Sequence, residues 1–204
     1  MLKVYGPARS RAGRVLWMLE ECAVPYTHED LTRYPTMEEK AAAVKSASPL
    51  GKVPFLEDGD LQLAESMAIN LHLARKHGGH LWPADEGDQA KALQWSFFAI
   101  AEIEPPIIQL LIERGFRKED QRDKQNEQKN DTLLKRPLAY LEACLAGREF
   151  LVGNSFTVAD LNAASIFMMA AGAKVDLAGY PHTKAWTERC FARPAFVRAM
   201  TPRT

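Results

Sequence analysis

Two short motifs, Val53-Pro54 and Glu65-Ser66, hold the residues of this chain best suited to bind a ligand. Proline cannot donate a hydrogen bond within a sheet, so Pro54 must lie at a strand start, at a sheet edge or after a cis peptide bond. A cis bond would turn the main-chain N–H and C=O of Val53 outward, where they could pair with an extended peptide. Glu65 and Ser66 would offer backbone N–H groups and a hydroxyl to a carboxylate at a helix start. The motifs therefore indicate a site for a small extended peptide with a free carboxylate.

A simpler interpretation stays open for both motifs. A proline that starts a strand before an ordinary hairpin needs no ligand. Glu65 or Ser66 could likewise do no more than cap a helix. The two motifs alone do not decide between a peptide site and these structural roles, so the elements around them have to be considered.

Strand-like and helix-like patterns alternate over the first part of the chain. Strands are predicted at residues 2–5, 25–31, 53–56 and 61–63, and helices at residues 11–23, 37–47 and 65–77. Asp58-Gly59-Asp60 is typical of a hairpin turn between the last two strands. This order of elements predicts a small α/β domain.

From residue 88 onward the strand patterns stop, and helices are predicted at 88–117, 123–146, 157–171, 182–192 and 194–200. The connector 78–87 is rich in glycine, proline and charge, so we predict one domain over residues 1–79 and an all-helical domain over residues 88–204. Residues 113–136 include fourteen charged side chains of both signs, which predicts the solvated end of a helical hairpin. Thr157 and Asp160 form a predicted capping box at the start of a buried helix, with Phe156 as its hydrophobic staple.

The composition excludes several classes of protein. The 204 residues are 47% apolar and 25% charged, which is ordinary for a globular chain, and the formal net charge of zero argues against a nucleic-acid or anionic membrane partner. No long apolar run and no signal peptide is visible, so we expect a cytoplasmic protein. Cys22, Cys144 and Cys190 are widely separated and odd in number, and no glycine-rich phosphate loop occurs, so neither a metal nor a nucleotide is expected.

Four motifs, in this order, resemble those of the cytosolic glutathione transferases along nearly the whole chain. The first helix, which opens with Ser10-Arg-Ala-Gly-Arg-Val-Leu-Trp, is similar to that of bacterial and fungal serine-like members. The other three are Ser48-Pro49-Leu50-Gly51-Lys52-Val53-Pro54, with Ser48 where the family has Asn, then Glu65-Ser66-Met67-Ala68-Ile69, and last Phe156-Thr157-Val158-Ala159-Asp160.

The resemblance implies a thioredoxin-like N-terminal domain, an all-helical C-terminal domain, a homodimer, and reduced glutathione as the cosubstrate. It assigns the main chain of Val53, exposed by a cis Pro54, to the cysteinyl part of glutathione. It assigns Glu65 and Ser66 to the γ-glutamyl carboxylate. Lys52 is implied for the glycyl carboxylate, although an exposed lysine is equally often only solvated.

The resemblance leaves two candidates for the group that activates the thiol. Glutathione reacts as a thiolate, which a neutral hydroxyl and a helix N-terminus can stabilise. Ser10 lies in the turn before the first helix, where serine-type members keep this hydroxyl, flanked by Arg9 and Arg11. Tyr5 ends the first strand at the spacing of tyrosine-type members. We favour Ser10, although it could be an N-cap bonded to Gly13 N–H, and Tyr5 could be a core aromatic.

The resemblance places the pocket for a hydrophobic electrophile beside the first long helix of the second domain. Phe98 and Glu102 could face that pocket, although aromatic residues at such positions more often belong to the core. The implied function is a detoxifying glutathione S-transferase. Alternatives are a glutathione-dependent isomerase, dehalogenase or peroxidase, or a non-catalytic binding protein on the same scaffold.

Overall fold

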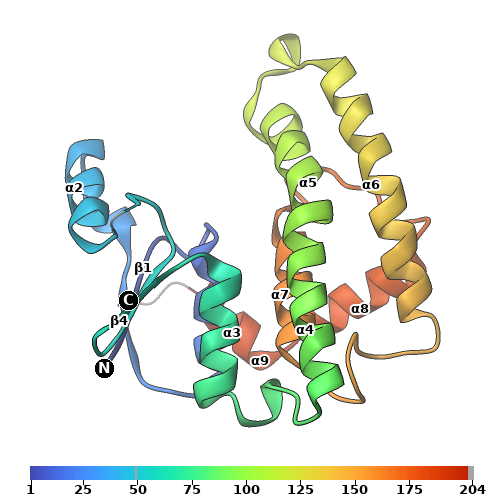
Figure 1. Cartoon of the computed structure of the whole chain (residues 1–204). Helices are drawn as coiled ribbons and strands as arrows, with labels where there is room; N and C mark the ends of the chain where they lie inside the picture. The colour runs from blue at the N-terminus through green and yellow to red at the C-terminus, as the bar shows by residue number, and fades with distance from the viewer. Residues whose placement is uncertain (49, 202–204) are drawn as a thin grey trace. The chain divides into compact units, whose positions relative to one another are not determined.

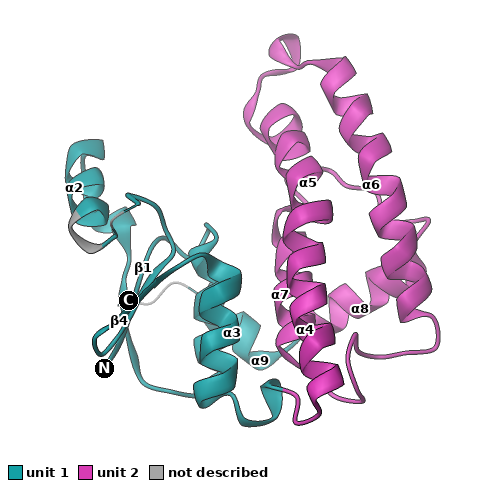
Figure 2. Ribbon diagram, in the orientation of Figure 1, with its two compact units in different colours: residues 1–82, 192–204 teal, residues 83–191 magenta. Residues whose placement is uncertain are grey.

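A computed structural model describes residues 1–48 and 50–201 of the chain. The chain divides into two compact units, one formed by residues 1–82 and 192–204 and the other by residues 83–191 (Figure 2). The first unit contains the sheet, and the second is helical (Figure 1). The predicted fold class, a thioredoxin-like domain followed by an all-helical domain, is confirmed.

The sheet of unit 1 has four strands in the order β2-β1-β3-β4. Their bounds are Leu2–Tyr5 for β1, Tyr26–Glu29 for β2, Phe55–Asp58 for β3 and Leu61–Ala64 for β4. β1 is parallel to β2 and antiparallel to β3, and β3 and β4 form the predicted hairpin around Gly59. The third strand starts at Phe55, two residues later than predicted, because Pro54 has no N–H to donate to a neighbour.

Three helices of unit 1 follow the predicted pattern: α1 (Ala12–Cys22), α2 (Met37–Ala47) and α3 (Ser66–His77). α1 packs against α3, and both contact the sheet. Val4 of β1 and Leu56 of β3 lie opposite one another in the sheet, and both are fully buried. The apolar face of α1 completes the core, since Leu16 and Leu19 are also buried.

The last helix, α9 (Pro194–Met200), belongs to unit 1 because it packs on α1. Arg193 makes a two-pronged contact with Glu21, with Nε–Oε1 and Nη2–Oε2 distances of 2.6 and 2.7 Å. The ring of Phe196 meets Trp17 edge to face at 4.9 Å between centroids. The compact units therefore differ from the predicted domain of residues 88–204, because helical periodicity does not tell which body a helix packs against.

Unit 2 begins with a continuous helix over Glu86–Phe116. It consists of α4 (Glu86–Phe98), a π-helical turn (Ala99–Ile103), α5 (Glu104–Leu111) and a second π-helical turn. The first π turn precedes Pro105-Pro106, which cannot bond the carbonyls of the preceding turn, so irregularity is expected there. By length and composition this helix could cross a membrane, but buried core helices pass the same test.

The remaining helices of unit 2 are α6 (Lys124–Leu145), α7 (Val158–Ile166) and α8 (Pro181–Phe191). All nine residues of α7 are buried, and α4 and α8 both pack against it. The predicted capping box is confirmed. The Thr157 side chain accepts a hydrogen bond from the backbone N–H of Asp160, and the Asp160 side chain accepts one from the backbone N–H of Thr157. Asp160 does more than cap: its Oδ1 also accepts from Leu151 N at 2.8 Å and from Trp186 Nε1 at 3.0 Å.

We predict that Asp160→Ala lowers the free energy of unfolding by about 4 kcal/mol, because it leaves several buried donors without an acceptor. Urea unfolding followed by circular dichroism measures this loss. Glu188→Ala, an exposed acidic position on α8, is the matched control and should change the value by less than about 0.5 kcal/mol. Equal effects of the two substitutions would contradict the role assigned to Asp160.

Candidate functional site

Sheet register brings the two predicted binding motifs to one end of unit 1. Phe55, the first residue of β3, pairs with the last residue of β1 on one side and the last residue of β4 on the other. The segments just beyond these strand ends therefore meet. They are Gly6 after β1, Val53-Pro54 before β3 and Glu65 after β4.

The Val53-Pro54 peptide bond is cis, as the peptide-site interpretation required. Val53 lies outside the sheet, and within residues 1–48 and 50–201 its N–H and C=O make no backbone hydrogen bond. Gly6 holds the turn after β1 against it: a Cβ on Gly6 would lie 2.9 Å from Val53 Cβ and 2.8 Å from Ala12 Cβ. The φ of Gly6 is +129°, which favours glycine. The turn that carries Ser10 is therefore fixed close to Val53.

Glu65 is strained in its backbone and exposed in its side chain. Its φ of 68° and ψ of 110° are rare for a residue with a Cβ, and such strain concentrates at ligand clamps. It occupies the N-cap position of α3, yet its side chain makes no capping hydrogen bond. The helix-cap interpretation of Glu65 is therefore wrong, and the first N–H groups of α3 receive no side-chain cap from it.

Ser66 begins α3 and is 2% exposed. Its Oγ accepts a hydrogen bond from Nη1 of Arg14 at 3.4 Å, and Arg14 is itself 2% exposed. Asn70 Nδ2 donates to the carbonyl of Arg14 at 3.4 Å, which ties α3 to α1. Sequence reasoning missed Arg14; the signal was an arginine on the otherwise apolar buried face of α1, beside Val15.

The Ser10 hydroxyl is partly buried at the start of α1. It donates to Pro7 O at 2.7 Å and accepts from Ala12 N at 3.1 Å. The expected capping bond to Gly13 is absent from these contacts, because Gly13 N donates to the backbone carbonyl of Ser10 instead. The one hydroxyl proton is thus held by a backbone carbonyl in the turn next to Val53.

The Tyr5 hydroxyl points toward the other end of the sheet. It donates to Glu57 Oε1 at 3.1 Å, and Glu57 pairs with Lys3, two residues further from the Val53-Pro54 end. The ring is 8% exposed and lies 6.1 Å from Phe55, with the Lys3 ammonium 4.6 Å above its centroid. This arrangement matches the alternative in which Tyr5 is a packed aromatic of the sheet.

The remaining predicted site residues lie elsewhere. Lys52 is exposed beside Val53. Phe98 and Glu102 belong to unit 2, where the Phe98 ring packs edge-on against Trp95 at 5.5 Å and Tyr140 at 5.2 Å, and Glu102 is exposed. Pro49 of the predicted motif lies outside the described residues.

Cys22 is not an alternative nucleophile that would compete with a bound thiol. Burial, with a smaller contribution from the Glu21 carboxylate, raises the pKa of the Cys22 thiol to about 12. A thiol with that pKa stays protonated and unreactive at neutral pH. Cys190 is buried, and none of the three cysteines forms a disulfide bond within the described chain. Across the described residues, no group of three or more His, Cys, Asp or Glu side chains is arranged to hold a metal ion.

Comparison with known proteins gives matches along almost the whole chain. Two family models match it, "Glutathione S-transferase, N-terminal domain" over residues 9–76 and "Glutathione S-transferase, C-terminal domain" over residues 103–194. Glutathione S-transferase 4 of Zea mays is 34% identical, with 95% of this chain and 89% of that protein covered.

Solved structures give similar matches. The theta class glutathione S-transferase of Xanthomonas axonopodis pv. citri, with glutathione bound, has a TM-score of 0.85 and 26% identity, covering 99% of this chain and 98% of that one. The nitrogen regulation fragment of the yeast prion protein Ure2p has a TM-score of 0.84 and 26% identity, covering 98% and 95%.

We predict that Gly6→Ala lowers the free energy of unfolding by about 3 kcal/mol, because the new methyl group collides with Val53 and Ala12 at an unfavourable φ. Gly59→Ala is the control: Gly59 has a φ of +63° but nothing within 4 Å of the added Cβ, so the loss should be about 1 kcal/mol. Urea titration compares the two. A loss at Gly6 no larger than at Gly59 would contradict the close packing of this turn.

Proposed function

The chain belongs to the glutathione S-transferase family, and we propose that it binds reduced glutathione at the sheet end around Val53 and transfers its sulfur to a hydrophobic electrophile. The observation that carries the proposal is the free main chain of Val53 beside the uncapped N-terminus of α3. An extended peptide can pair with the first, and a carboxylate can bind the second.

Each part of glutathione then has a partner in unit 1. The cysteinyl main chain pairs with the N–H and C=O of Val53. The γ-glutamyl carboxylate accepts from the Ser66 hydroxyl and the first N–H groups of α3, and the buried Arg14 guanidinium beside Ser66 adds positive charge. Lys52 is exposed next to Val53 and serves the glycyl carboxylate.

Ser10 activates the thiol in this proposal. A free thiol is mostly protonated at neutral pH, and a hydroxyl directed at sulfur stabilises the thiolate. The hydroxyl proton now bonded to Pro7 O would turn to the sulfur, while Ala12 N continues to donate to Ser10 Oγ and orients it. The start of α1 adds a favourable field for the anion. The Tyr5 hydroxyl donates to Glu57, which supports assigning activation to Ser10 in preference to Tyr5.

We predict that Ser10→Ala raises the pKa of enzyme-bound glutathione by about 1–2 units and lowers kcat about 100-fold, with little change in glutathione affinity. Ultraviolet thiolate absorbance across pH gives the pKa, and conjugation of an aromatic halide gives kcat. Tyr5→Phe is the control and should leave the thiol pKa unchanged. The reverse pattern, a normal pKa in Ser10→Ala and a raised one in Tyr5→Phe, would assign activation to Tyr5.

A second candidate function is glutathione binding without turnover. The similarity to the Ure2p nitrogen regulation fragment supports keeping this candidate, and isomerase, dehalogenase and peroxidase reactions would use the same thiolate. Calorimetric titration with glutathione, followed by assays on electrophile, peroxide and isomerisation substrates, separates these functions. Binding without any turnover supports the second candidate, and no binding at millimolar glutathione contradicts both.

The electrophile contacts are assigned to the helix that contains the first π turn. Phe98 immediately precedes the turn Ala99–Ile103, and Glu102 is exposed within it. Turns of this kind are frequent at functional sites because they re-aim side chains. We also assign the protein to the cytoplasm, since glutathione chemistry and cysteines that form no disulfide within the described chain both suit a reducing compartment.

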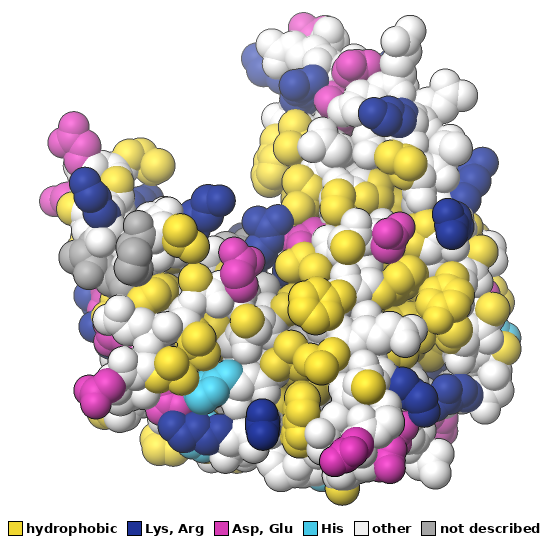
Figure 3. Space-filling model, viewed as in Figure 1, with side chains coloured by type: hydrophobic (Ala, Val, Ile, Leu, Met, Phe, Trp, Pro, Cys, Tyr) yellow, Lys and Arg dark blue, Asp and Glu magenta, His cyan; other side chains and the backbone are white. Residues whose placement is uncertain are grey.

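The homodimer is assigned to an apolar surface on α4 and α6, which we call the α4–α6 face. Figure 3 shows hydrophobic side chains gathered over these helices. Its large exposed apolar side chains, with their exposed fractions, are Leu93 (39%), Phe97 (66%), Leu133 (52%) and Tyr140 (44%). Leu93 and Phe97 lie one turn apart and so share a side of α4. Clustered exposed apolar residues of this size mark protein interfaces.

We predict that Phe97→Asp converts the dimer to a monomer in sedimentation velocity runs, because it places a charge in the apolar interface. Phe116→Asp is the control, since Phe116 is 76% exposed at the far end of the same helix. An unchanged dimer in Phe97→Asp, or a monomeric wild type, would contradict the assignment.

A further inference from the structure

The main-chain carbonyl of Gly6 is bonded to the ring of His28, a residue that none of the assignments above uses. His28 Nε2 lies 2.8 Å from Gly6 O. Gly6 is the first residue after β1 and is buried, so its carbonyl needs a hydrogen-bond donor. Because a carbonyl oxygen can only accept, Nε2 of the ring must carry a hydrogen. The bond therefore fixes the direction in which the Gly6 carbonyl points.

Sheet register explains how His28 reaches this carbonyl. His28 on β2 pairs with Val4 on β1, and directly paired residues of neighbouring strands point to the same face of a sheet. The side chain of Val4 is fully buried, so His28 places a polar ring on the buried face. A polar group in such a position needs a hydrogen-bond partner. Gly6, two residues after Val4, supplies that partner with its main chain.

A second bond holds Gly6 from the same strand. Gly6 N donates to the carbonyl of Glu29, the neighbour of His28 on β2, at 3.1 Å. No backbone N–H of residues 1–48 and 50–201 donates to the Gly6 carbonyl, so the ring of His28 is the donor that keeps this buried acceptor satisfied. Loss of the ring would leave the carbonyl without that bond and free the peptide group to rotate.

The direction of the Gly6 carbonyl is linked to the Ser10 hydroxyl. Gly6 C=O and the nitrogen of Pro7 belong to one planar peptide group, so a fixed carbonyl also fixes the start of Pro7. Pro7 O accepts from Ser10 N at 3.0 Å and from Ser10 Oγ at 2.7 Å. Ala12 N donates to Ser10 Oγ at 3.1 Å. A chain of contacts therefore runs from the His28 ring through the Gly6–Pro7 peptide to the Ser10 hydroxyl.

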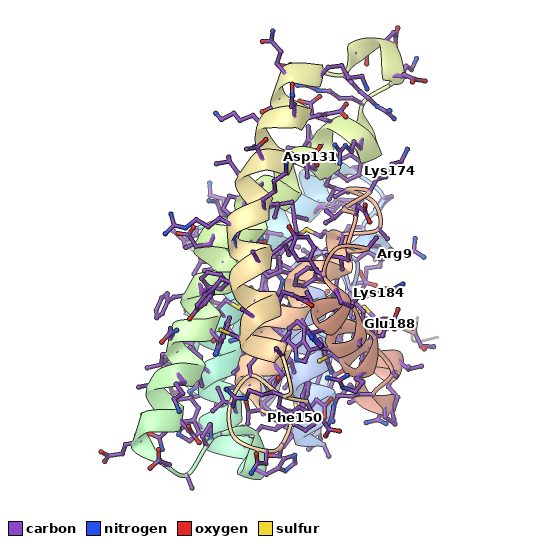
Figure 4. All side chains as sticks on the ribbon, turned by 90° about the vertical axis from the view of Figure 1, so that its right-hand side faces the viewer. Arg9, Asp131, Phe150, Lys174, Lys184 and Glu188 are labelled. Carbon is purple, nitrogen blue, oxygen red and sulfur yellow. The ribbon has the colours of Figure 1, made fainter. Side chains whose placement is uncertain are left out.

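The turn needs such an anchor because of its residue types. A glycine adopts many backbone conformations, and Gly6 must keep a φ of +129° to lie against Val53. Arg9, labelled in Figure 4, has an exposed side chain and so does not hold the turn from the core. A bond from the rigid sheet to the Gly6 carbonyl selects one of the conformations that glycine allows.

We propose that His28 is a positioning residue for thiol activation, which holds the Ser10 hydroxyl in place through the Gly6 carbonyl. This inference rests on the proposed function, in which Ser10 Oγ stabilises the glutathione thiolate. The ring contacts the Gly6 carbonyl and acts on Ser10 only through the turn. A displacement of about 1 Å at a reacting group can lower a rate about 100-fold, so the anchor matters for turnover more than for glutathione binding.

His28→Leu should raise the pKa of enzyme-bound glutathione by about 0.5–1 unit and lower kcat about tenfold, with less than about a twofold change in glutathione affinity. His28→Gln should keep both values close to those of the wild type, because the amide of glutamine can donate from nearly the position of Nε2. His80→Leu, the same change at an exposed histidine, is the matched control and should behave as the wild type does.

A double variant tests whether His28 acts through Ser10. In the Ser10→Ala background, His28→Leu should lower kcat by less than about twofold, because the hydroxyl that it positions is absent. An equal loss of kcat in both backgrounds, a normal thiol pKa in His28→Leu, or a His28→Gln variant as impaired as His28→Leu would overturn the inference.

Hydrogen exchange in the ligand-free protein separates this inference from the proposed function. The Ala12 amide is protected by its bond to Ser10 Oγ, so its exchange followed by NMR reports on the turn. Exchange at Ala12 should be about tenfold faster in His28→Leu and unchanged in His28→Gln. Unchanged exchange in His28→Leu would overturn the positioning role alone. A wild type that binds no glutathione would contradict the proposed function and the role of His28 in it.

Discussion

The pairing of β3 with strands on both sides is the constraint on which the rest of unit 1 depends. Because Phe55 pairs with the last residue of β1 and the last residue of β4, three chain segments leave the sheet at one end. Pro54 stops the ladder there by lacking an N–H, which leaves the main chain of Val53 without a strand partner. The sheet thereby supplies both the rigid support and the exposed backbone that binding a peptide requires.

Several residues that hold the Val53-Pro54 end of the sheet together also lower the stability of the folded state. Gly6 allows the Ser10 turn to approach Val53 and adopts a φ of +129° to do so. Glu65 keeps an unfavourable backbone conformation at the start of α3, and Arg14 places a guanidinium on the buried face of α1. α9 also packs on α1, so the helix that bears Arg14 is held by α3, by the sheet and by α9. Such packing over-determines strained residues and keeps them in place.

Local chemistry was sufficient to predict much of this from the sequence. The hairpin at Gly59, the Thr157–Asp160 capping box and the break at Pro54 each follow from residue types a few positions apart. Features that depend on distant partners could not be predicted. The direction of the Tyr5 hydroxyl is decided by Glu57 on another strand, and the placement of α9 is decided by Glu21, 172 residues before Arg193. The partners of Arg114 are nearer, since Glu127 and Asp131 lie 13 and 17 residues further along the chain, but they too are on another helix.

The central claim is that sheet register places the main chain of Val53, the start of α3 and the Ser10 hydroxyl around one peptide. A crystal structure with reduced glutathione tests it most directly. The account predicts the cysteinyl main chain hydrogen-bonded to Val53, the γ-glutamyl carboxylate on Ser66, and the sulfur within about 3.5 Å of Ser10 Oγ. Glutathione bound away from Val53, or with its sulfur against the Tyr5 hydroxyl, would contradict the account.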